Sequence, residues 1–309
     1  MPIKGTLHVA VVVWALGQGQ ASVASEPSAK PPIIDMHLHA GPEPWLTGSK
    51  DAILAAMVRH NIVLGVVSGP PEYLEAWQSA APKGIRLIAA PMFPCPGTNA
   101  PNGGPQCFPD GQPFPQIDWL RQQYKSGRMG AMGEITAQYA GMPPADPALE
   151  PYFALAEELD IPVGIHMSLA PPGTPYACCP RFRVALGNPL LLEEVLIKHP
   201  RLRIYIMHGG HPWTEETIGL MYIYPQVYAD VSAINHPDKQ PRAEFHEYLA
   251  RMFKAGFGKR LMYGSDFGFV FDKTIESIQS APFLTEEQKR DILYNNAARF
   301  LRLEKAGVK

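Results

Sequence analysis

The sequence contains little charge, few cysteines and no hydrophobic run long enough for a membrane span. Charged residues make up 18% of the 309 positions and the net charge is −2, so no basic field would attract nucleic acid or an anionic membrane surface. An apolar run over residues 7–16, broken only by His8, is too short to cross a bilayer. The four cysteines have no Cys-x-x-Cys spacing, which argues against a thiolate metal site. These absences favour a small-molecule substrate, with no nucleic acid and no membrane anchor as partners.

The N-terminus has the pattern of a cleavable signal peptide. Lys4 precedes the apolar run, and Ser22-Val23-Ala24 offers small residues where a signal peptidase cuts. We therefore expect a signal peptide over residues 1–24, a linker over 25–32, and a periplasmic or secreted protein. The alternative is a buried N-terminal strand or helix, which the polar, Ser- and Pro-rich linker disfavours.

The four cysteines fit an oxidising compartment. Cys95 and Cys107 flank a loop rich in Pro, Gly and Asn, and we favour a disulfide between them. A ring between the adjacent Cys178 and Cys179 is strained, so we expect these two to be free, or one of them to reach Cys95 or Cys107. The sequence alone does not choose among the three full pairings.

Eight short apolar segments alternate with amphipathic stretches, the pattern of repeated βα units with a parallel sheet. The predicted strands cover residues 33–37, 62–67, 86–90, 129–134, 162–166, 203–208, 227–231 and 260–264. Helices are expected between them, for example over 51–59, 147–159, 189–198 and 242–253. A last helical segment opens with a Thr285-x-x-Gln288 capping box and runs to about residue 303. This alternation predicts a single-domain α/β TIM barrel over residues 33–303, followed by a C-terminal tail over 304–309.

Metal-binding residue types stand at the ends of these strands. Side chains two apart on a strand point the same way, so His37 and His39 offer two imidazoles to one place, with Met36 and Leu38 on the other side. The carboxyl ends of barrel strands share one rim, so the other strand-end candidates converge there as well. The six predicted metal ligands are His37, His39, Glu134, His166, His208 and Asp266.

The chemistry of these groups points to a divalent ion. Imidazole and carboxylate suit zinc above all, with manganese or iron as alternatives, and one or two ions would fit the set. Such an ion lowers the pKa of bound water, and Asp266 is the natural general base to accept its proton. Each residue alone has a simpler interpretation, because a strand-end His or Asp can also cap a helix or bond a loop.

As a set these motifs resemble the amidohydrolase-related (amidohydrolase 2) branch of the amidohydrolase superfamily. The resemblance runs from about residue 33 to 303, and its elements are Asp35-Met36-His37-Leu38-His39, Gly133-Glu134, His166, His208-Gly209-Gly210-His211-Pro212-Trp213, Tyr228-Ala229-Asp230-Val231-Ser232 and Tyr263-Gly264-Ser265-Asp266. It implies a distorted TIM barrel with metal bound by His37, His39, His166 and Asp266. It implies that His208 acts on the substrate in a one-metal site and binds the second metal in a two-metal site. A glutamate at the position of Glu134 bridges two metals in a related branch. A homodimer is a further implication of the resemblance alone.

The family contains both hydrolases and nonoxidative decarboxylases, and both need this set of residues. We expect a metal-dependent hydrolase of an ester, lactone or amide-type bond, with Asp266 as general base, because Glu134 can support a second metal or orient water. An exported enzyme is also more plausibly a hydrolase of a nutrient or toxin. The first alternative is a metal-dependent decarboxylase of a carboxylic acid. The second is an exported metal- or ligand-binding barrel without turnover.

Substrate contacts are expected from the loops at the rim. The segment over residues 170–188 contains Tyr176, Arg181 and Arg183, and an arginine there can bind a substrate carboxylate in bidentate fashion. Solvation or pairing with nearby acids is the simpler role for both arginines. His211 is a candidate for proton transfer as a catalytic residue, against a role in stabilising its loop. Trp213 is a candidate for substrate binding, with packing as the alternative.

Overall fold

The structure, a computed structural model, describes Met1 and residues 30–42, 48–95 and 107–303. The chain divides into two compact units, residues 1–30 and 31–309, and the barrel belongs to the second. The predicted signal peptide, most of the predicted linker and the predicted tail over 304–309 lie outside the described residues, so these boundaries stay predictions. Within the described ranges, none of the helices combines the length and the apolar character that a membrane span requires.

Strands are present at all eight predicted places, in two parallel sheets. One sheet has the order β1 (Ile33–His39), β2 (Ile62–Gly69) and β3 (Arg86–Pro91). The second has the order β4 (Met132–Ile135), β5 (Val163–His166), β6 (Ile204–Met207), β7 (Val227–Asp230) and β8 (Leu261–Met262). Their runs of buried apolar residues are typical of parallel strands covered on both faces.

Two isolated bridges join the sheets into a closed ring. Leu38 pairs with Asp266 between β1 and the segment after β8, and Phe93 pairs with Ile135 between the segment after β3 and β4. At the first seam the Asp266 N–H donates to the His37 carbonyl over 2.8 Å. The result is the predicted α/β TIM barrel, closed at two seams by isolated bridges rather than by continuous strand pairing.

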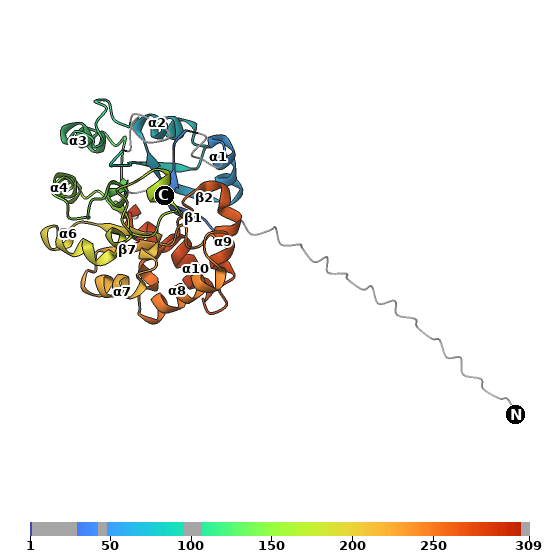
Figure 1. Cartoon of the computed structure of the whole chain (residues 1–309). Coiled ribbons are helices and arrows are strands. Elements are labelled where there is room, and N and C mark those ends of the chain that lie inside the picture. The colour runs from blue at the N-terminus through green and yellow to red at the C-terminus, as the bar shows by residue number, and fades with distance from the viewer. Residues whose placement is uncertain (2–29, 43–47, 96–106, 304–309) are drawn as a thin grey trace. The chain divides into compact units, whose positions relative to one another are not determined.

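Helices surround the strands (Figure 1). They are α1 (Lys50–Arg59), α2 (Pro71–Ala80), α3 (Ile117–Lys125), α4 (Glu150–Leu159), α5 (Thr174–Ala177), α6 (Glu193–Lys198), α7 (Thr214–Ile223), α8 (Arg242–Lys254) and α9 (Phe271–Gln279). Short 3-10 turns lie at η1 (Ala137–Ala140), η2 (Val184–Gly187), η3 (Pro189–Leu192), η4 (His208–Gly210), η5 (Gly258–Arg260) and η6 (Gly268–Val270). The larger apolar core lies between the strands and these helices.

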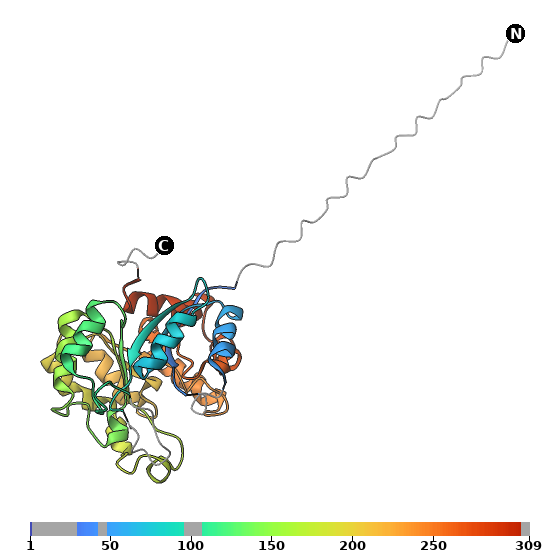
Figure 2. The same cartoon turned by 90° about the horizontal axis from the view of Figure 1, so that it is seen from above.

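A second apolar cluster fills the barrel interior and is closed by the C-terminal helices. It contains Met36, Tyr205 and Met262 from the strands, together with Ala297 and Phe300 from α11 (Asn296–Phe300). Figure 2 shows these C-terminal helices, in dark red, at one end of the barrel and the loop around α5 at the other. The interior is therefore packed, and its open end is the one that carries the strand-end histidines.

The predicted C-terminal helical segment is present, with an irregularity. Thr285 and Gln288 form the expected capping box at the start of α10 (Glu286–Arg290). A π-helical turn, η7 (Asp291–Asn295), then separates α10 from α11. Within this turn the Ile292 carbonyl accepts a hydrogen bond from the Tyr263 N–H over 2.8 Å. This contact ties the π turn to the residue that follows β8.

The predicted alternation along β1 is wrong at one point. Met36 packs inside the barrel, whereas Leu38 belongs to the outer core between strands and helices. The pairing of β1 with β2 shifts its register between Asp35 and Leu38, so side chains two apart no longer share a face there. His37 and His39 nevertheless meet, as described below.

Candidate metal centre and active site

Side chains from the ends of five strands meet at one end of the barrel. His37 Nε2 lies 3.1 Å from His39 Nε2, and Asp266 Oδ1 lies 3.2 Å from His39 Nε2 and 3.7 Å from His37 Nε2. The side chains of His37 and Asp266 are buried, and that of His39 is half-buried at 15% exposure. The parallel strands explain the meeting, because their carboxyl ends all reach this rim. The structure brings together all six predicted residues, His37, His39, Glu134, His166, His208 and Asp266.

Glu134 lies between imidazoles from three strands. Its Oε1 is 2.6 Å from His166 Nδ1 and 3.4 Å from His208 Nε2, and its Oε2 is 3.3 Å from His39 Nε2. Burial alone would raise the pKa of the Glu134 carboxyl, but hydrogen bonds from His166, His208 and the β1 histidines lower it well below its usual range. Glu134 is therefore a carboxylate, the form that binds a cation.

Among the residues that the structure describes, two groups of three side chains could hold a metal ion, and they share His37. One is His37, His39 and Asp266, and the other is His37, Glu134 and His208. Within each group the ligand atoms lie within 4.8 Å of one another. Imidazole and carboxylate donors of this kind suit zinc, manganese or iron. The residues present therefore fit one divalent ion, or two ions of which only one would take His37, because an imidazole Nε2 has a single lone pair.

His166 reaches this cluster but belongs to neither group of three among the described residues. Its Nδ1 faces Glu134, and its Nε2 lies 3.2 Å from the Leu169 carbonyl. Burial lowers the pKa of His166 and outweighs the attraction of Glu134, so the ring is kept neutral. Its predicted role as a metal ligand stays a prediction.

Nearby carboxylates favour protonation of the two β1 histidines when no ion is bound. Burial opposes the imidazolium form, yet Asp230 and Glu134 raise the pKa of His37 well above its usual value. For His39 the same opposition is overcome by Asp266 and Glu134, which raise its pKa. The carboxylates thus attract positive charge to the place where a metal ion would lie.

Lys239, in the loop after β7, was not predicted as a site residue. Its Nζ donates to Asp266 Oδ2 over 2.7 Å, while Asp266 Oδ1 faces the β1 histidines. Burial would raise the pKa of Asp266, but the hydrogen bond from His39 and the charge of Lys239 lower it. Lys239 Nζ also lies 5.2 Å from the centre of the Phe267 ring, which stacks on His39. No strand periodicity indicates a loop lysine, so sequence reasoning had no signal for it.

Asp230 and Ser232 are a second omission. The resemblance included both residues, but sequence reasoning gave them no role. Asp230 ends β7, and both side chains are fully buried. They contact the Nδ1 atoms of His37 and His208, on the side opposite the Nε2 atoms that face the cluster. Their position at a strand end, two residues apart as in His37 and His39, is the signal that could have marked them.

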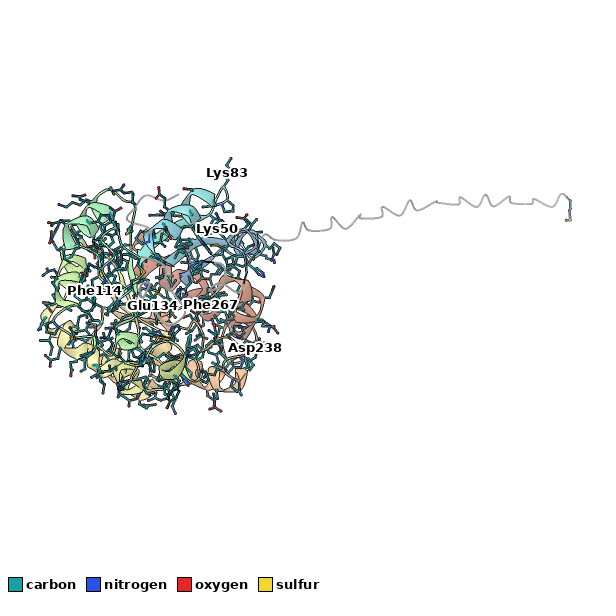
Figure 3. All side chains as sticks on the ribbon, turned by 45° about the horizontal axis from the view of Figure 1, so that its top comes forward. Lys50, Lys83, Phe114, Glu134, Asp238 and Phe267 are labelled. Atoms are coloured by element: carbon teal, nitrogen blue, oxygen red, sulfur yellow. A yellow bond between two sulfur atoms is a disulfide. The ribbon has the colours of Figure 1, made fainter. Side chains whose placement is uncertain are left out.

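A cavity of about 1360 Å³ opens over the cluster. Apolar side chains, among them Met92, Phe114 and Leu169, line it together with His39, Glu134, His166, His208 and Asp266. Figure 3 labels Glu134 and Phe267 near the middle of the ring of helices. An apolar pocket with a few convergent polar groups is typical of a small-molecule site.

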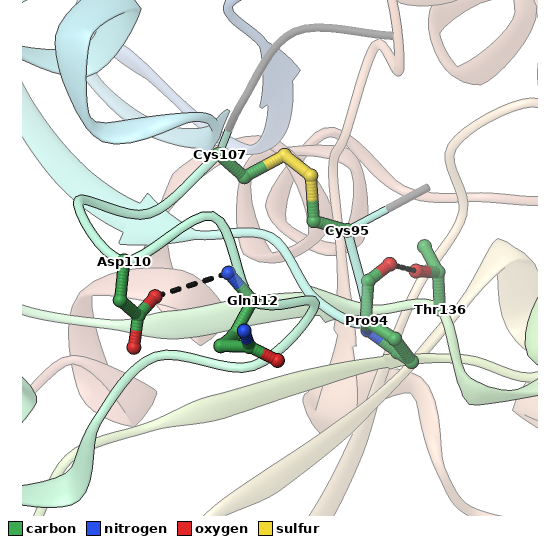
Figure 4. The surroundings of a disulfide bond; sticks show 6 residues. All are labelled: Pro94, Cys95, Cys107, Asp110, Gln112 and Thr136. Carbon is green, nitrogen blue, oxygen red and sulfur yellow. Dashed lines mark hydrogen bonds between the residues drawn. A yellow bond between two sulfur atoms is a disulfide. The ribbon is translucent and has the colours of Figure 1, made fainter. Parts of the chain in front are cut away.

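Both disulfides of the structure reach this cavity. Cys95 is joined to Cys107, as favoured from the sequence, and Cys178 is joined to its neighbour Cys179 rather than left free. The second pair follows α5 in a tight turn, where the N–H groups of both cysteines donate to the Thr174 carbonyl. Figure 4 shows the first pair beside a hydrogen bond from the side chain of Thr136 to the Pro94 carbonyl, 3.2 Å long. Disulfides thus restrain two segments of the cavity wall.

The predicted rim residues divide into two groups. Arg181 and His211 line the cavity, and burial lowers the pKa of His211. Tyr176, Arg183 and Trp213 are not among the described residues that line it. Tyr176 is 95% exposed, and Arg183 donates to two backbone carbonyls of its own loop. Their predicted role in substrate binding has no support from these positions.

Three solved structures illustrate the proteins whose fold is similar to that of this chain. An uncharacterized TIM-barrel protein of Bordetella bronchiseptica is 16% identical, with a TM-score of 0.63, over 88% of this chain and 99% of that one. A "probable" 2-pyrone-4,6-dicarboxylic acid hydrolase of Acinetobacter baumannii, with citric acid bound, is 14% identical, with a TM-score of 0.58, over 88% and 100%. A dihydroxybenzoic acid decarboxylase of a Polaromonas species, with manganese and the inhibitor 2-nitroresorcinol bound, is 12% identical, with a TM-score of 0.61, over 88% and 97%.

No protein with a curated description matches the chain. A family model described as amidohydrolase, however, matches residues 34–303, which include all eight strands of the barrel except the first residue of β1, and all six side chains of the cluster. The solved structures are similar in fold, and they include both hydrolases and decarboxylases. This chain belongs to the amidohydrolase 2 family of the amidohydrolase superfamily.

Proposed function

We propose that this chain is a metal-dependent hydrolase that cleaves an ester, lactone or amide-type bond in a small substrate. The observation that carries the proposal is the pair of ligand groups that share His37 beneath a cavity of about 1360 Å³. Glu134 supports hydrolysis in particular, because it gives the second group a carboxylate that can hold another ion or orient water. We propose zinc as the ion, with manganese or iron as alternatives.

A divalent ion at this place would polarise a carbonyl and lower the pKa of water enough to supply hydroxide near neutral pH. The Asp266 carboxylate accepts a proton from the attacking water and passes it to the leaving group. Lys239 helps to keep Asp266 in its proton-accepting form, because its positive charge lowers the pKa of that carboxyl. His208 either contacts the substrate oxygen or binds the second ion. His211, kept neutral by burial, is in the form that accepts a proton.

Decarboxylation is the second candidate, and one contact favours it. The Phe267 ring stacks on His39 with centres 5.1 Å apart and an angle of 25° between the planes. This gives the cavity a flat apolar surface beside the ligand groups, where an aromatic acid would stack. The relative from Polaromonas is itself a dihydroxybenzoic acid decarboxylase. In this reaction the ion would hold an oxygen substituent while an acid protonates the ring carbon.

Metal analysis and an activity screen test the proposal together. The purified chain should contain a divalent ion, and after it is stripped and reloaded it should hydrolyse at least one member of a panel of lactones, esters and amides. Aromatic carboxylates belong in the same panel with detection of carbon dioxide. Carbon dioxide released from an aromatic acid, with no hydrolytic product from any class, would replace hydrolysis by decarboxylation.

Substitution of Asp266 separates an enzyme from a binding protein. The variant D266N should lose activity by about 10²- to 10⁴-fold, because it removes the proton acceptor. The matched control is D272N, since Asp272 is 84% exposed and pairs with His60 outside the cavity. A chain that binds metal but shows no activity on any substrate class would be the non-catalytic barrel.

We also propose export through cleavage after Ala24, to a periplasm or beyond. The support is the charged start, short apolar run and small residues of the sequence. N-terminal sequencing of the protein recovered from an exported fraction should begin at Ser25. A full-length N-terminus in the cytoplasmic fraction would exclude this route.

A further inference from the structure

Ser232 lies between two histidines that belong to the ligand groups. Its Oγ is 2.9 Å from His37 Nδ1, 3.0 Å from His208 Nδ1 and 2.6 Å from Asp230 Oδ1. Ser232 and Asp230 are fully buried, so no solvent competes for these contacts. One hydroxyl therefore contacts a histidine of β1 and the histidine that follows β6.

Asp230 determines the direction of the serine hydroxyl. Asp230 Oδ1 already accepts from the backbone N–H groups of His208, over 3.1 Å, and Ser232, over 2.8 Å, so it acts as an acceptor. The bond to the N–H two residues later is an Asx turn, which also brings the serine side chain to the carboxylate. Ser232 Oγ therefore donates its single proton to Asp230.

With that proton committed, Ser232 Oγ offers only lone pairs to the imidazoles. His37 Nδ1 and His208 Nδ1 must each carry a proton to bond it. The second neighbour of each Nδ1 atom is also an acceptor and therefore also requires a proton on that nitrogen. His37 Nδ1 faces Asp230 Oδ2, and His208 Nδ1 faces the Ser232 carbonyl, both at 3.3 Å. Every neighbour of the two Nδ1 atoms among these contacts is an acceptor, so the hydrogen-bond pattern has one solution.

We propose that Ser232 and Asp230 are positioning residues that fix the tautomer of His37 and His208, so that both present Nε2 to the same cluster. The proposal rests on the proposed metal-dependent function. Nε2 is the atom that faces the cluster, since His37 Nε2 is 3.1 Å from His39 Nε2 and His208 Nε2 is 3.4 Å from Glu134 Oε1. His37 belongs to both ligand groups, so one serine prepares the shared ligand and a ligand of the second group together.

Manganese binding by the metal-stripped full chain tests this role without a substrate. The variants are S232A, which removes the shared acceptor, and D230N, which replaces one carboxylate oxygen by an N–H donor. Both should bind Mn²⁺ about 10- to 100-fold more weakly than the wild type, the range found when partners of metal-binding histidines are removed. The control is S277A, a buried serine whose hydroxyl donates to the Lys273 carbonyl on α9, and its affinity should be unchanged.

A spectroscopic measurement separates this proposal from the metal proposal. In the metal-free wild type labelled with [¹⁵N]histidine, Nδ1 of both His37 and His208 should have the chemical shift of a protonated nitrogen. In D230N the His37 signal should move toward the unprotonated form. An unprotonated Nδ1 on either histidine of the wild type, or Mn²⁺ affinities of S232A and D230N equal to the wild type, would overturn the inference. If the wild type binds neither Mn²⁺ nor Zn²⁺, the metal proposal fails and the ¹⁵N shifts alone decide this one.

Discussion

Asp35 gives the sharpest prediction, because its carboxyl group is fully buried, whereas carboxyl groups are normally ionised and exposed to water. It is fully buried in β1, and its Oδ1 accepts from the N–H groups of His37 and Ser265, each over 3.0 Å. Its Oδ2 has no hydrogen-bond partner among the described residues. Burial raises the pKa of Asp35 to about 7 from a usual 3.8, against the lowering effect of hydrogen bonds from Ser265 and His37. The folded metal-free protein therefore holds this carboxyl neutral at mildly acidic pH.

The magnitude follows from linkage between proton binding and folding. Between pH 3.8 and about 7 the unfolded chain has released this proton and the folded chain has kept it, so the stability of the fold falls as the pH rises. At 1.36 kcal/mol for each pKa unit, the difference amounts to about 4 kcal/mol, and the loss is complete above pH 7. The variant D35N cannot ionise and removes this loss.

The assay is denaturant unfolding of the wild type and D35N with a chelator present, across this pH range. D35N should gain stability relative to the wild type as the pH rises, by up to about 4 kcal/mol, with an offset at all pH values from its unpaired amide. D118N is the control, because Asp118 is exposed on α3. A difference between the wild type and D35N that stays constant with pH would refute the idea that burial keeps this carboxyl neutral.

Three further predictions concern the site and the scaffold. E134Q should bind Mn²⁺ at least about tenfold more weakly than the wild type, measured by calorimetry, and equal affinity would remove Glu134 from the metal site. G164A should lose about 1–3 kcal/mol of unfolding free energy, because a Cβ there would lie 2.5 Å from the Tyr205 ring; wild-type stability would mean that the ring moves aside freely. R260M should lose about 2–4 kcal/mol, because Arg260 donates to three backbone carbonyls near α7 and β7; a smaller loss in thermal unfolding would show that water replaces these bonds.

The barrel could be predicted because the sequence pattern of each βα unit is local and recurs eight times along the chain. Each strand is a short apolar run, and parallel strands with helical connections place all carboxyl ends at one rim. The meeting of His37 with Asp266, more than two hundred residues later in the chain, follows from that rule alone. The roles of the six side chains, by contrast, stay predictions, because the distances between them are compatible with more than one choice of metal ligands.

The rest depends on loop conformation and on local departures from regular structure. Lys239 reaches Asp266 from the loop after β7, and no periodicity constrains such a loop. Tyr176 and Arg183 were predicted to face the substrate, but their loop turns one to solvent and the other to its own backbone. The register shift between Asp35 and Leu38 in β1 separates Met36 from Leu38, although strict alternation would keep them on one face.

The two seams between the sheets have a consequence for the stability of the protein. His37 and His39 come from the sheet of three strands, whereas Glu134, His208 and Asp266 come from the sheet of five or its extensions. An ion held by both would fasten the two halves together, adding about 2.7 kcal/mol of resistance to unfolding when its free concentration is 100 times its dissociation constant. The unfolding temperature and the resistance to proteolysis would then depend on the concentration of trace metal in the surroundings. A chelator would lower the stability of the fold as well as the catalytic activity.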